Sequence, residues 1–227
     1  MNPDNWEQFK TTAEVFLIPG TSRNHSQVVN GLAEIDSANW EQLTTIGNAL
    51  SQGLPSIYKE WIFDILKKTP PAKWQQFKTI AENITQEMSE KNRAELIHLL
   101  GLIYPPILFH EKFLSTAQIL TRGAQKRDYY QIIKYLKYDT MYEEIQRLLS
   151  EVDPTRIHLS NTDYSTMESL LMNIERYRHQ GFTTQLIEFI NGHEGDISDD
   201  VLRTYFNSYH NQPRRGLGYQ HSTNQED

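Results

Sequence analysis

The chain repeats the segment Asn5-Trp6-Glu7-Gln8-Phe9-Lys10-Thr11-Thr12-Ala13-Glu14-Val15-Phe16 as Lys73-Trp74-Gln75-Gln76-Phe77-Lys78-Thr79-Ile80-Ala81-Glu82-Asn83-Ile84, with seven of twelve positions identical. A third copy, residues 39–50, lies midway, so that Trp6, Trp40 and Trp74 are spaced by 34 residues. A repeat of this length normally encodes one helical hairpin, which buries its apolar face only against its neighbours. The spacing therefore predicts stacked helical hairpins.

The positions 3, 6, 7 and 10 after the tryptophan carry mostly apolar residues, which in the middle copy include Leu43, Ile46 and Leu50. These positions share one stripe of an α-helix, so the segment is expected to be the first helix of each hairpin. Position seven is small in every copy: Ala13, Gly47 and Ala81. We expect close helix crossings there, and both Trp40 and Trp74 at least half buried.

A second amphipathic stretch follows each tryptophan segment. Its apolar residues are Val28, Val29 and Leu32, then Ile62, Ile65 and Leu66, then Leu96, Leu99 and Leu100. Ser37 and Ser89 are expected to be N-caps of the helices that follow them, and Pro70 with Pro71 marks the boundary between two hairpins.

The pattern continues in degenerate form after residue 103. His110 stands where tryptophan stood, after a shift of two residues that an insertion at Tyr104-Pro105-Pro106 would explain. The expected core positions of the fourth and fifth hairpins are Phe113, Thr116, Ala117, Leu120, Ile132, Tyr135 and Leu136, then Tyr142, Ile145, Leu148, Leu149 and Val152. The second helix of the fifth hairpin is expected over residues 166–177.

Residues 153–163 show no clear periodicity and form the longest connection that we expect, which is either a functional loop or a tolerated insertion. A last hairpin follows, with Phe182, Leu186, Phe189 and Ile190 on one helix and Val201, Leu202, Tyr205 and Phe206 on the other. Ser198 with the acidic Asp199 and Asp200 is a favourable helix start.

The sequence thus predicts an all-α protein, a right-handed α-α superhelix (a solenoid of five or six helical hairpins), with an irregular multi-helix bundle as the alternative. One repeat domain is expected over residues 1–210, in units of about 3–35, 36–69, 70–104, 105–138, 139–179 and 180–210. Residues 211–227 have few apolar side chains and are expected to form a disordered polar tail.

The repeat length and the tryptophan near the start of the first helix resemble the tetratricopeptide repeat, and the hairpin architecture is also similar to HEAT repeats. The pattern departs from the tetratricopeptide family four positions after the tryptophan, where Lys10, Thr44 and Lys78 replace a small residue. It departs again at the small position seven, where that family has a large aromatic residue. The resemblance therefore implies a divergent helical repeat and carries over no peptide-binding residues.

Composition narrows the class of protein. The net charge is −7 from 22 basic and 29 acidic residues, and there is no cysteine for disulfides, thiol catalysis or thiolate metal sites. No apolar run approaches the roughly 18 residues that a membrane span needs, and the start of the chain lacks the pattern of a cleavable signal peptide. We expect a cytoplasmic protein.

Catalytic and metal-binding patterns are weak. No two of the eight histidines are three or four residues apart, and Glu95-Leu96-Ile97-His98 is the only Glu-x-x-His motif. Such motifs bind metal in pairs on different helices, so we expect no metal, no cofactor and no enzyme activity. The alternative is an enzyme or nucleic-acid-binding module whose site is assembled from dispersed residues such as His110 and His158.

Residues 110–138 form a locally basic stretch, with six lysine or arginine residues against Glu111 and Asp128, and four tyrosines. Aromatic residues beside basic ones are common in protein interfaces and in single-stranded nucleic-acid platforms. Lys126, Arg127, Tyr130 and Lys134 are the candidate partner-binding residues, whereas Tyr135 is expected in the core. A solvated helix face is the alternative.

A protein partner, with an acidic one as one option, suits this stretch better than nucleic acid, because the acidic chain as a whole would repel phosphate. The sequence therefore predicts a non-catalytic scaffold or adaptor for protein–protein interaction. The polar, Ser/Thr-bearing and acidic C-terminus resembles the export signals of type IV secretion effectors of intracellular bacteria. That resemblance implies a secreted bacterial effector or a regulator of one, and gives as the alternative to the cytoplasm a host cell, reached by export without a cleavable signal peptide.

Overall fold

The computed structural model describes residues 3–211, and the expected polar tail lies outside these residues apart from Asn211. All regular elements of the described residues are helical, in agreement with the expected all-α class. The α-helices are α1 (Pro3–Phe16), α2 (Ser22–Ala33), α3 (Trp40–Ser51), α4 (Tyr58–Lys68), α5 (Pro71–Thr85), α6 (Glu90–Gly101), α7 (Pro105–Leu108), α8 (Phe113–Thr121), α9 (Tyr129–Ile133), α10 (Asp139–Glu151), α11 (Tyr164–Tyr177), α12 (Phe182–Gly192) and α13 (Asp199–Asn211). Five short 3₁₀ helices join them: η1 (Ser37–Asn39), η2 (Lys126–Asp128), η3 (Lys134–Lys137), η4 (Leu159–Asn161) and η5 (Arg178–Gln180).

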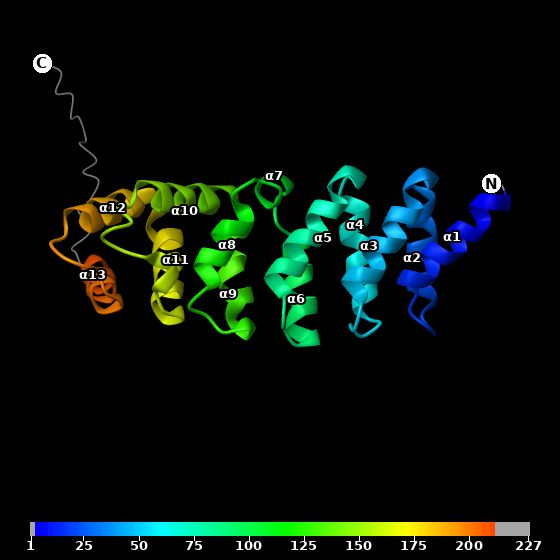
Figure 1. The fold of residues 1–227 in the computed structure, drawn as a ribbon, viewed down its shortest axis with the longest axis horizontal. Coiled ribbons are helices and arrows are strands. Elements are labelled where there is room, and N and C mark those ends of the chain that lie inside the picture. Colours follow the sequence, from blue (N-terminus) through cyan, green and yellow to red (C-terminus); the bar gives the residue numbers. More distant parts are fainter. Residues whose placement is uncertain (1–2, 212–227) are drawn as a thin grey trace, which may run out of the picture.

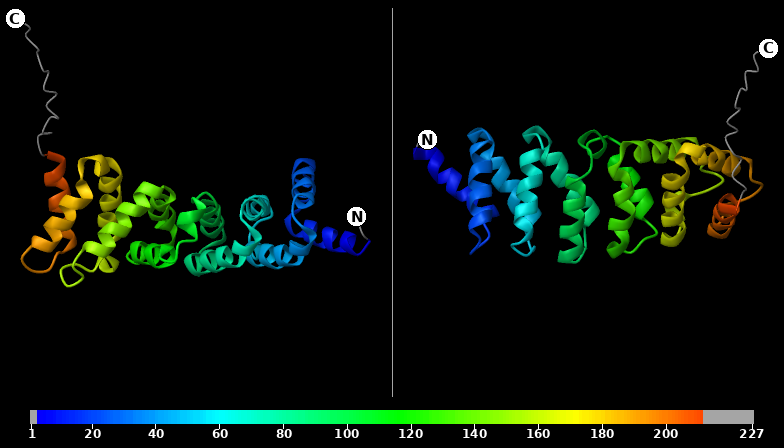
Figure 2. Two further views of the ribbon diagram at one scale, coloured as in Figure 1. Left: turned by 90° about the horizontal axis from the view of Figure 1, so that it is seen from above. Right: turned by 180° about the vertical axis from the view of Figure 1, so that it is seen from behind.

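The helices form antiparallel pairs that follow one another along the long axis of the molecule (Figure 1). Each pair packs a first helix on a second one: α1 on α2, α3 on α4, α5 on α6, α8 on α9 and α10 on α11. In the last pair, α12 meets α13 through aromatic rings, such as Phe182 against Phe206. The second helices α2, α4, α6, α9, α11 and α13 also contact their neighbours in that order, and Figure 2 shows them as one row. We call this row the second-helix layer.

The two inner tryptophans occupy equivalent settings. Trp40 is 3% exposed and Trp74 is 1% exposed, which confirms the expectation that both are at least half buried. Each indole N–H donates to a carbonyl five residues earlier, that of Ile35 for Trp40 (3.1 Å) and that of Thr69 for Trp74 (2.8 Å). The tryptophan therefore closes the connection from the preceding hairpin as well as filling the core.

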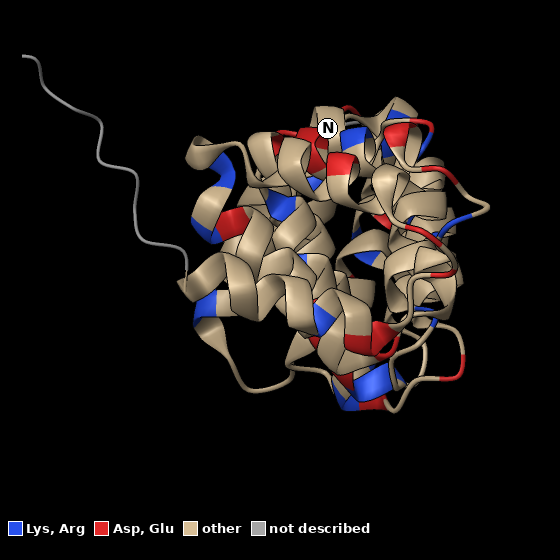
Figure 3. Cartoon of the chain, turned by 90° about the vertical axis from the view of Figure 1, so that its left-hand side faces the viewer, with Lys and Arg blue, Asp and Glu red and all other residues tan. Residues whose placement is uncertain are grey.

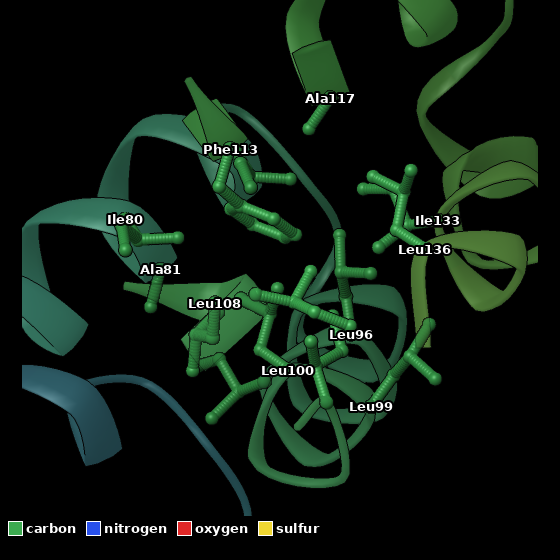
Figure 4. Close-up of a cluster of buried hydrophobic side chains, with 14 of the residues drawn as sticks. Ile80, Ala81, Leu96, Leu99, Leu100, Leu108, Phe113, Ala117, Ile133 and Leu136 are labelled. Atoms are coloured by element: carbon green, nitrogen blue, oxygen red, sulfur yellow. The ribbon is translucent and has the colours of Figure 1, made fainter. Parts of the chain in front are cut away.

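The small position of the repeat lies at close helix crossings. A Cβ atom on Gly47 would lie 2.3 Å from Cζ of Phe16 on the preceding first helix, and Ala81 is fully buried. Figure 4 shows Ala81 in the cluster that joins the third and fourth hairpins, together with Phe113 and Ala117. The expected close crossing is confirmed at Gly47, and Ala81 is buried in the core as that role requires.

A buried hydroxyl follows the small residue by four positions in three consecutive hairpins. Ser51, Thr85 and Thr121 each donate to the carbonyl one turn back, at 2.6, 2.7 and 2.7 Å. The hydroxyl satisfies its own hydrogen-bonding potential within the helix, so it can sit near the end of the apolar stripe without an unpaired polar atom. The sequence analysis did not identify this position.

Side chains of one hairpin also cap the first helix of the hairpin before it. The Arg93 guanidinium donates to the carbonyls of Gln52 (2.8 Å) and Ala49 (3.1 Å) at the end of α3. The Asn191 amide donates to the carbonyl of Glu151 (2.9 Å) at the end of α10. These bonds satisfy carbonyls that have no partner within their own helix.

Several local expectations can be compared with the structure. Ser89 caps α6 and the Ser198 hydroxyl accepts from the N–H of Val201 (3.4 Å), as expected. The expected cap Ser37 was wrong: Asp36 accepts the N–H of Ala38, and Ser37 already belongs to η1. The Asp36 carboxylate, one residue before Ser37, thus caps the short helix η1, which leads directly into α3.

The fourth hairpin is less regular than the repeat predicts. The insertion at residues 104–106 is not a plain loop, because its two prolines start the short helix α7, a position that suits proline. The second helix of this hairpin is divided into η2, α9 and η3. A 3₁₀ turn aligns residues three apart, which places Ile132 and Tyr135, and likewise Ile133 and Leu136, in the core.

The described helices include none that is both long and apolar enough to span a bilayer. Basic and acidic residues are interspersed around both rows of helices when the molecule is viewed from its C-terminal end (Figure 3). Charge of one sign therefore gathers only locally, and the fourth hairpin is the place where the sequence predicts such a gathering.

Candidate functional site

The four candidate residues lie on the second helix of the fourth hairpin, in the middle of the second-helix layer. Lys126 and Arg127 belong to η2, Tyr130 to α9 and Lys134 to η3. Tyr135, in the next position, is 6% exposed, in agreement with its expected place in the core. We call Lys126, Arg127, Tyr130 and Lys134 the basic patch.

Two members of the basic patch have partners within the chain. The Lys126 ammonium donates to the carbonyl of Gln86 (2.7 Å), the C-cap residue of α5, and lies 5.6 Å from the ring centre of Tyr129. Lys126 thus caps the preceding hairpin much as Arg93 does. The Lys134 ammonium donates to the side-chain oxygen of Gln131 (2.8 Å).

Arg127 and Tyr130 are the more accessible members. The Arg127 side chain is 70% exposed, with its Nε atom 3.8 Å from the Asp128 carboxylate, and Tyr130 is 37% exposed. Lys137 and Tyr138 belong to the same basic stretch and follow the patch in the chain, but they were not among the candidate residues. Tyr138 is 53% exposed and the Lys137 ammonium lies 5.6 Å from the centre of its ring.

Acidic residues of the following hairpin lie near the patch. Burial, followed by the charges of Glu175 and Glu168 on α11, raises the pKa of the Tyr135 hydroxyl above its ordinary value. Glu168 and Glu175 thus lie close enough to Tyr135, the neighbour of Lys134 in the sequence, to oppose the positive charge on that side of the patch.

The loop at residues 153–163 is packed against the body of the protein. Ile157 and Leu159 are buried, and η4 contacts α8. A Cβ atom on Gly123 would lie 2.1 Å from the carbonyl oxygen of Thr162. The backbone of the loop therefore lies directly against the end of α8, the first helix of the fourth hairpin. The loop therefore fills the space between α8 and the hairpins that follow.

The loop also forms one wall of an open cleft of about 360 Å³. The opposite wall is the connection before α13, and the N–H of Ile197 donates to the carbonyl of Arg156 across it (3.0 Å). The polar lining residues include Arg156, His158, Asn161, Asp196 and Ser198. Charges of both signs line this cleft, which gives it no single electrostatic preference.

A carboxylate pair lies beside this cleft. The N–H of Asp163 donates to the Asp199 carboxylate (2.9 Å), and Arg203 donates to the Asp163 carboxylate. Burial raises the pKa of Asp163, but hydrogen bonds from Thr166, Asp199 and Arg203 outweigh it, so this pKa lies below its ordinary value. Burial raises the pKa of Asp199. The pair joins the starts of α11 and α13, which is a structural role.

The dispersed-site alternative depended on His110 and His158. His110 lies before α8, where its Nδ1 atom is 3.0 Å from the hydroxyl of Tyr142, whereas His158 lines the cleft of its own loop. Within residues 3–211, no group of three or more histidine, aspartate or glutamate residues has an arrangement that could hold a metal ion. No described contact brings His110 and His158 into one site.

His98 has a different environment, which the sequence analysis did not foresee. Its ring lies 4.4 Å from the ring of Trp61, and Tyr58 packs edge-on against the same tryptophan (5.0 Å). Burial, followed by the charge of Lys68, lowers the pKa of His98, although Asp64 acts in the opposite direction. The three rings join α4 to α6 within the second-helix layer.

Comparisons of the chain with protein families, with curated proteins and with solved structures found no match. The geometry of the basic patch and of the cleft is therefore the basis for any functional proposal.

Proposed function

We propose that the protein is a non-catalytic scaffold, a right-handed α-α superhelix of six hairpins that binds an acidic segment of another protein. The observation that supports this most directly is the accessibility of Arg127 and Tyr130 on the second-helix layer. An exposed guanidinium beside an exposed phenol is a combination enriched in protein interfaces. A scaffold of stacked hairpins presents such side chains on an extended surface without a catalytic pocket.

The proposed contact surface consists of Arg127, Tyr130 and Lys134, together with Lys137 and Tyr138. Lys126 contributes positive charge, but its ammonium already holds the end of α5. Glu168 and Glu175 limit the surface on the side of α11, so the partner carboxylates would pair with Arg127 and Lys137 first. An exposed ion pair of this kind increases the affinity and orients the partner mainly when several such pairs form together.

The test is a quantitative affinity capture of partners with three forms of the protein. One form is the wild type, the second carries Arg127→Glu, Lys134→Glu and Lys137→Glu, and the third carries Arg23→Glu, Lys59→Glu and Lys91→Glu as a matched control. The control changes the charge by the same amount at other places on the second-helix layer. Lys126 is left intact because its reversal would also remove a helix cap.

We expect one specific partner to be lost with the patch variant and retained with the control. Purified partner should then bind the wild type with an affinity that falls as salt concentration rises. Retention of every partner by the patch variant would show that this surface is not used. If the lost partner is a nucleic acid, the result would favour the alternative that the protein is a nucleic-acid-binding module.

A further inference from the structure

The first hairpin exposes side chains whose counterparts are buried in later hairpins. Trp6 is 50% exposed, whereas Trp40 is 3% and Trp74 is 1% exposed. Val29 is 42% exposed. Val29 stands three positions before the buried Leu32, and the next four second helices have a residue in the same relation to a buried leucine or isoleucine. These four residues are all buried: Phe63, Ile97, Ile133 and Leu171.

The internal hairpins show what covers these positions. The ring of Trp40 packs edge-on against Phe9 of the preceding hairpin, with ring centres 5.3 Å apart. Phe63 packs against Phe16 (5.1 Å) and fills the space that Gly31 leaves, since a Cβ atom on Gly31 would lie 2.6 Å from its ring. In the second hairpin, Trp40 and Phe63 are thus covered by side chains of the hairpin before it.

In the described part of the chain, the last hairpin has no successor that it could cover in this way. Tyr205 precedes the buried Phe206 as Gly31 precedes the buried Leu32, so Tyr205 stands in the covering position. Its ring stacks on Phe189 with centres 4.3 Å apart, and both rings are only partly buried. The C-terminal end of the array therefore carries two stacked, partly exposed aromatic rings on its last hairpin.

The sizes at the two ends are complementary. Inside the molecule, the small Gly31 faces the large Phe63. At the two ends the large and small residues are exchanged. The large Tyr205 stands in the position of Gly31, and the smaller Val29 stands in the position of Phe63. A contact between the two ends would therefore fill a similar volume to the contact between the first two hairpins.

We propose that a second copy of this chain binds end to end, with the Phe189 and Tyr205 side of one copy covering Trp6 and Val29 of the next. This contact continues the interface that the hairpins already make inside the chain. It is independent of the basic patch, which lies in the middle of the second-helix layer. The two contacting surfaces differ, so a pair of copies still presents one Trp6 and Val29 surface and one Phe189 and Tyr205 surface. Further copies can therefore add at both ends, and open chains of copies form.

The experiment is sedimentation velocity of the full chain over a series of concentrations. We expect the mean mass of the wild type to rise with concentration, and Trp6→Glu and Tyr205→Lys each to remain a monomer. A mixture of these two variants should form dimers and nothing larger, because each supplies one intact end. Leu102→Glu, a change at a 46% exposed residue in the middle of the array, should assemble like the wild type.

Circular dichroism verifies that each variant is folded, and Val29→Glu or Phe189→Lys replaces a variant that is not. A wild type that stays monomeric at all concentrations would overturn the proposal. Dimers formed by the Tyr205→Lys variant alone would overturn it as well, because they would show that two N-terminal ends meet. Loss of assembly in the Leu102→Glu control would show association without a specific surface.

Discussion

Gly47 and Phe16 approach each other more closely than any other side chain at position 47 would allow, since a Cβ atom there would lie 2.3 Å from Cζ of the ring. Phe16 is fully buried and packs against Phe63, so a movement of its ring would disturb that core contact. We therefore expect Gly47→Ala to destabilise the protein by about 1–3 kcal/mol through overpacking, despite the better helix propensity of alanine.

Urea denaturation followed by circular dichroism measures this change. Gly192→Ala is the matched control, because a Cβ atom on Gly192 would meet nothing within 4 Å. The control should be neutral or slightly stabilising. Equal stability of the Gly47→Ala variant and the wild type would contradict the close crossing. By the same reasoning, Ala81→Leu should cost about 1–3 kcal/mol at the next crossing.

The inner tryptophans provide a second prediction. The indole N–H of Trp74 donates to the carbonyls of Leu66 and Thr69, each at 2.8 Å. Trp74→Phe keeps an aromatic ring but leaves these carbonyls without that donor, which should cost about 1–3 kcal/mol. Trp6→Phe changes a half-exposed ring and should alter the unfolding free energy far less. Similar losses for the two variants would refute the anchoring role of Trp74.

The position of these tryptophans could be predicted from the sequence because the repeat is local. The positions 3, 6, 7 and 10 residues after the tryptophan share one stripe of the helix wherever that helix lies, so the core residues of the first helices α1, α3 and α5 follow from periodicity. The second-helix stripe is less reliable, since Val29 is 42% exposed. The environment of Arg93 could not be predicted in this way. Its partner carbonyls lie more than 40 residues earlier in the chain and are identified only once the hairpins are packed together.

The candidate site shows the same limit. The sequence located Lys126, Arg127, Tyr130 and Lys134 as a basic, tyrosine-rich stretch, but could not distinguish a lysine that caps a helix from an arginine whose side chain is mostly exposed. That distinction depends on Gln86, which the fold brings beside Lys126. Likewise, the aperiodic loop at residues 153–163 gave no sign that Gly123 is its docking point.

The cap formed by Arg93 leads to a third prediction. Its guanidinium donates to the carbonyls of Gln52 and Ala49, and also to that of Leu50 (3.3 Å). Arg93→Ala should lower the unfolding free energy by about 1–2 kcal/mol, since hydrogen bonds from a charged donor to the end of a helix are lost. Lys91→Ala, at a side chain 76% exposed, is the control and should change it by less than about 0.5 kcal/mol.

Thermal and urea denaturation of both variants measure the difference. Arg93→Lys should recover part of the loss, because one ammonium cannot reach all three carbonyls in the geometry of the guanidinium fork. A variant Arg93→Ala as stable as Lys91→Ala would show that the inter-hairpin cap contributes nothing.

His98 makes stability depend on pH. Burial and the charge of Lys68 lower the pKa of His98 from its ordinary value of 6.5, so the unfolded chain binds this proton more readily than the folded one. The contribution of neutral His98 is complete above pH 6.5 and is lost as the pH falls from there through the lower pKa of the folded protein. Acidification should therefore weaken the contact between α4 and α6.

Urea denaturation at pH 7.5 and at pH 5.5, compared between the wild type and His98→Phe, measures this dependence. Phenylalanine keeps a ring against Trp61 and removes the titration, so the loss of stability on acidification should be smaller in the variant. His25→Gln, at an exposed position on α2, should leave the pH dependence of the wild type unchanged. An identical dependence in His98→Phe would exclude His98 as its source.

Gly123 and the loop at residues 153–163 give the last prediction. A Cβ atom on Gly123 would lie 2.1 Å from the carbonyl oxygen of Thr162, and a backbone atom cannot turn away as a side chain can. Gly123→Ala should therefore displace the loop, expose Ile157 and make the peptide bond after Arg156 more accessible. Limited trypsin digestion should cleave there several times faster than in the wild type, whereas Gly192→Ala should leave the rate unchanged. An unchanged cleavage rate in Gly123→Ala would mean that the loop adjusts without leaving α8, and that its close contact with Gly123 does not hold it in place.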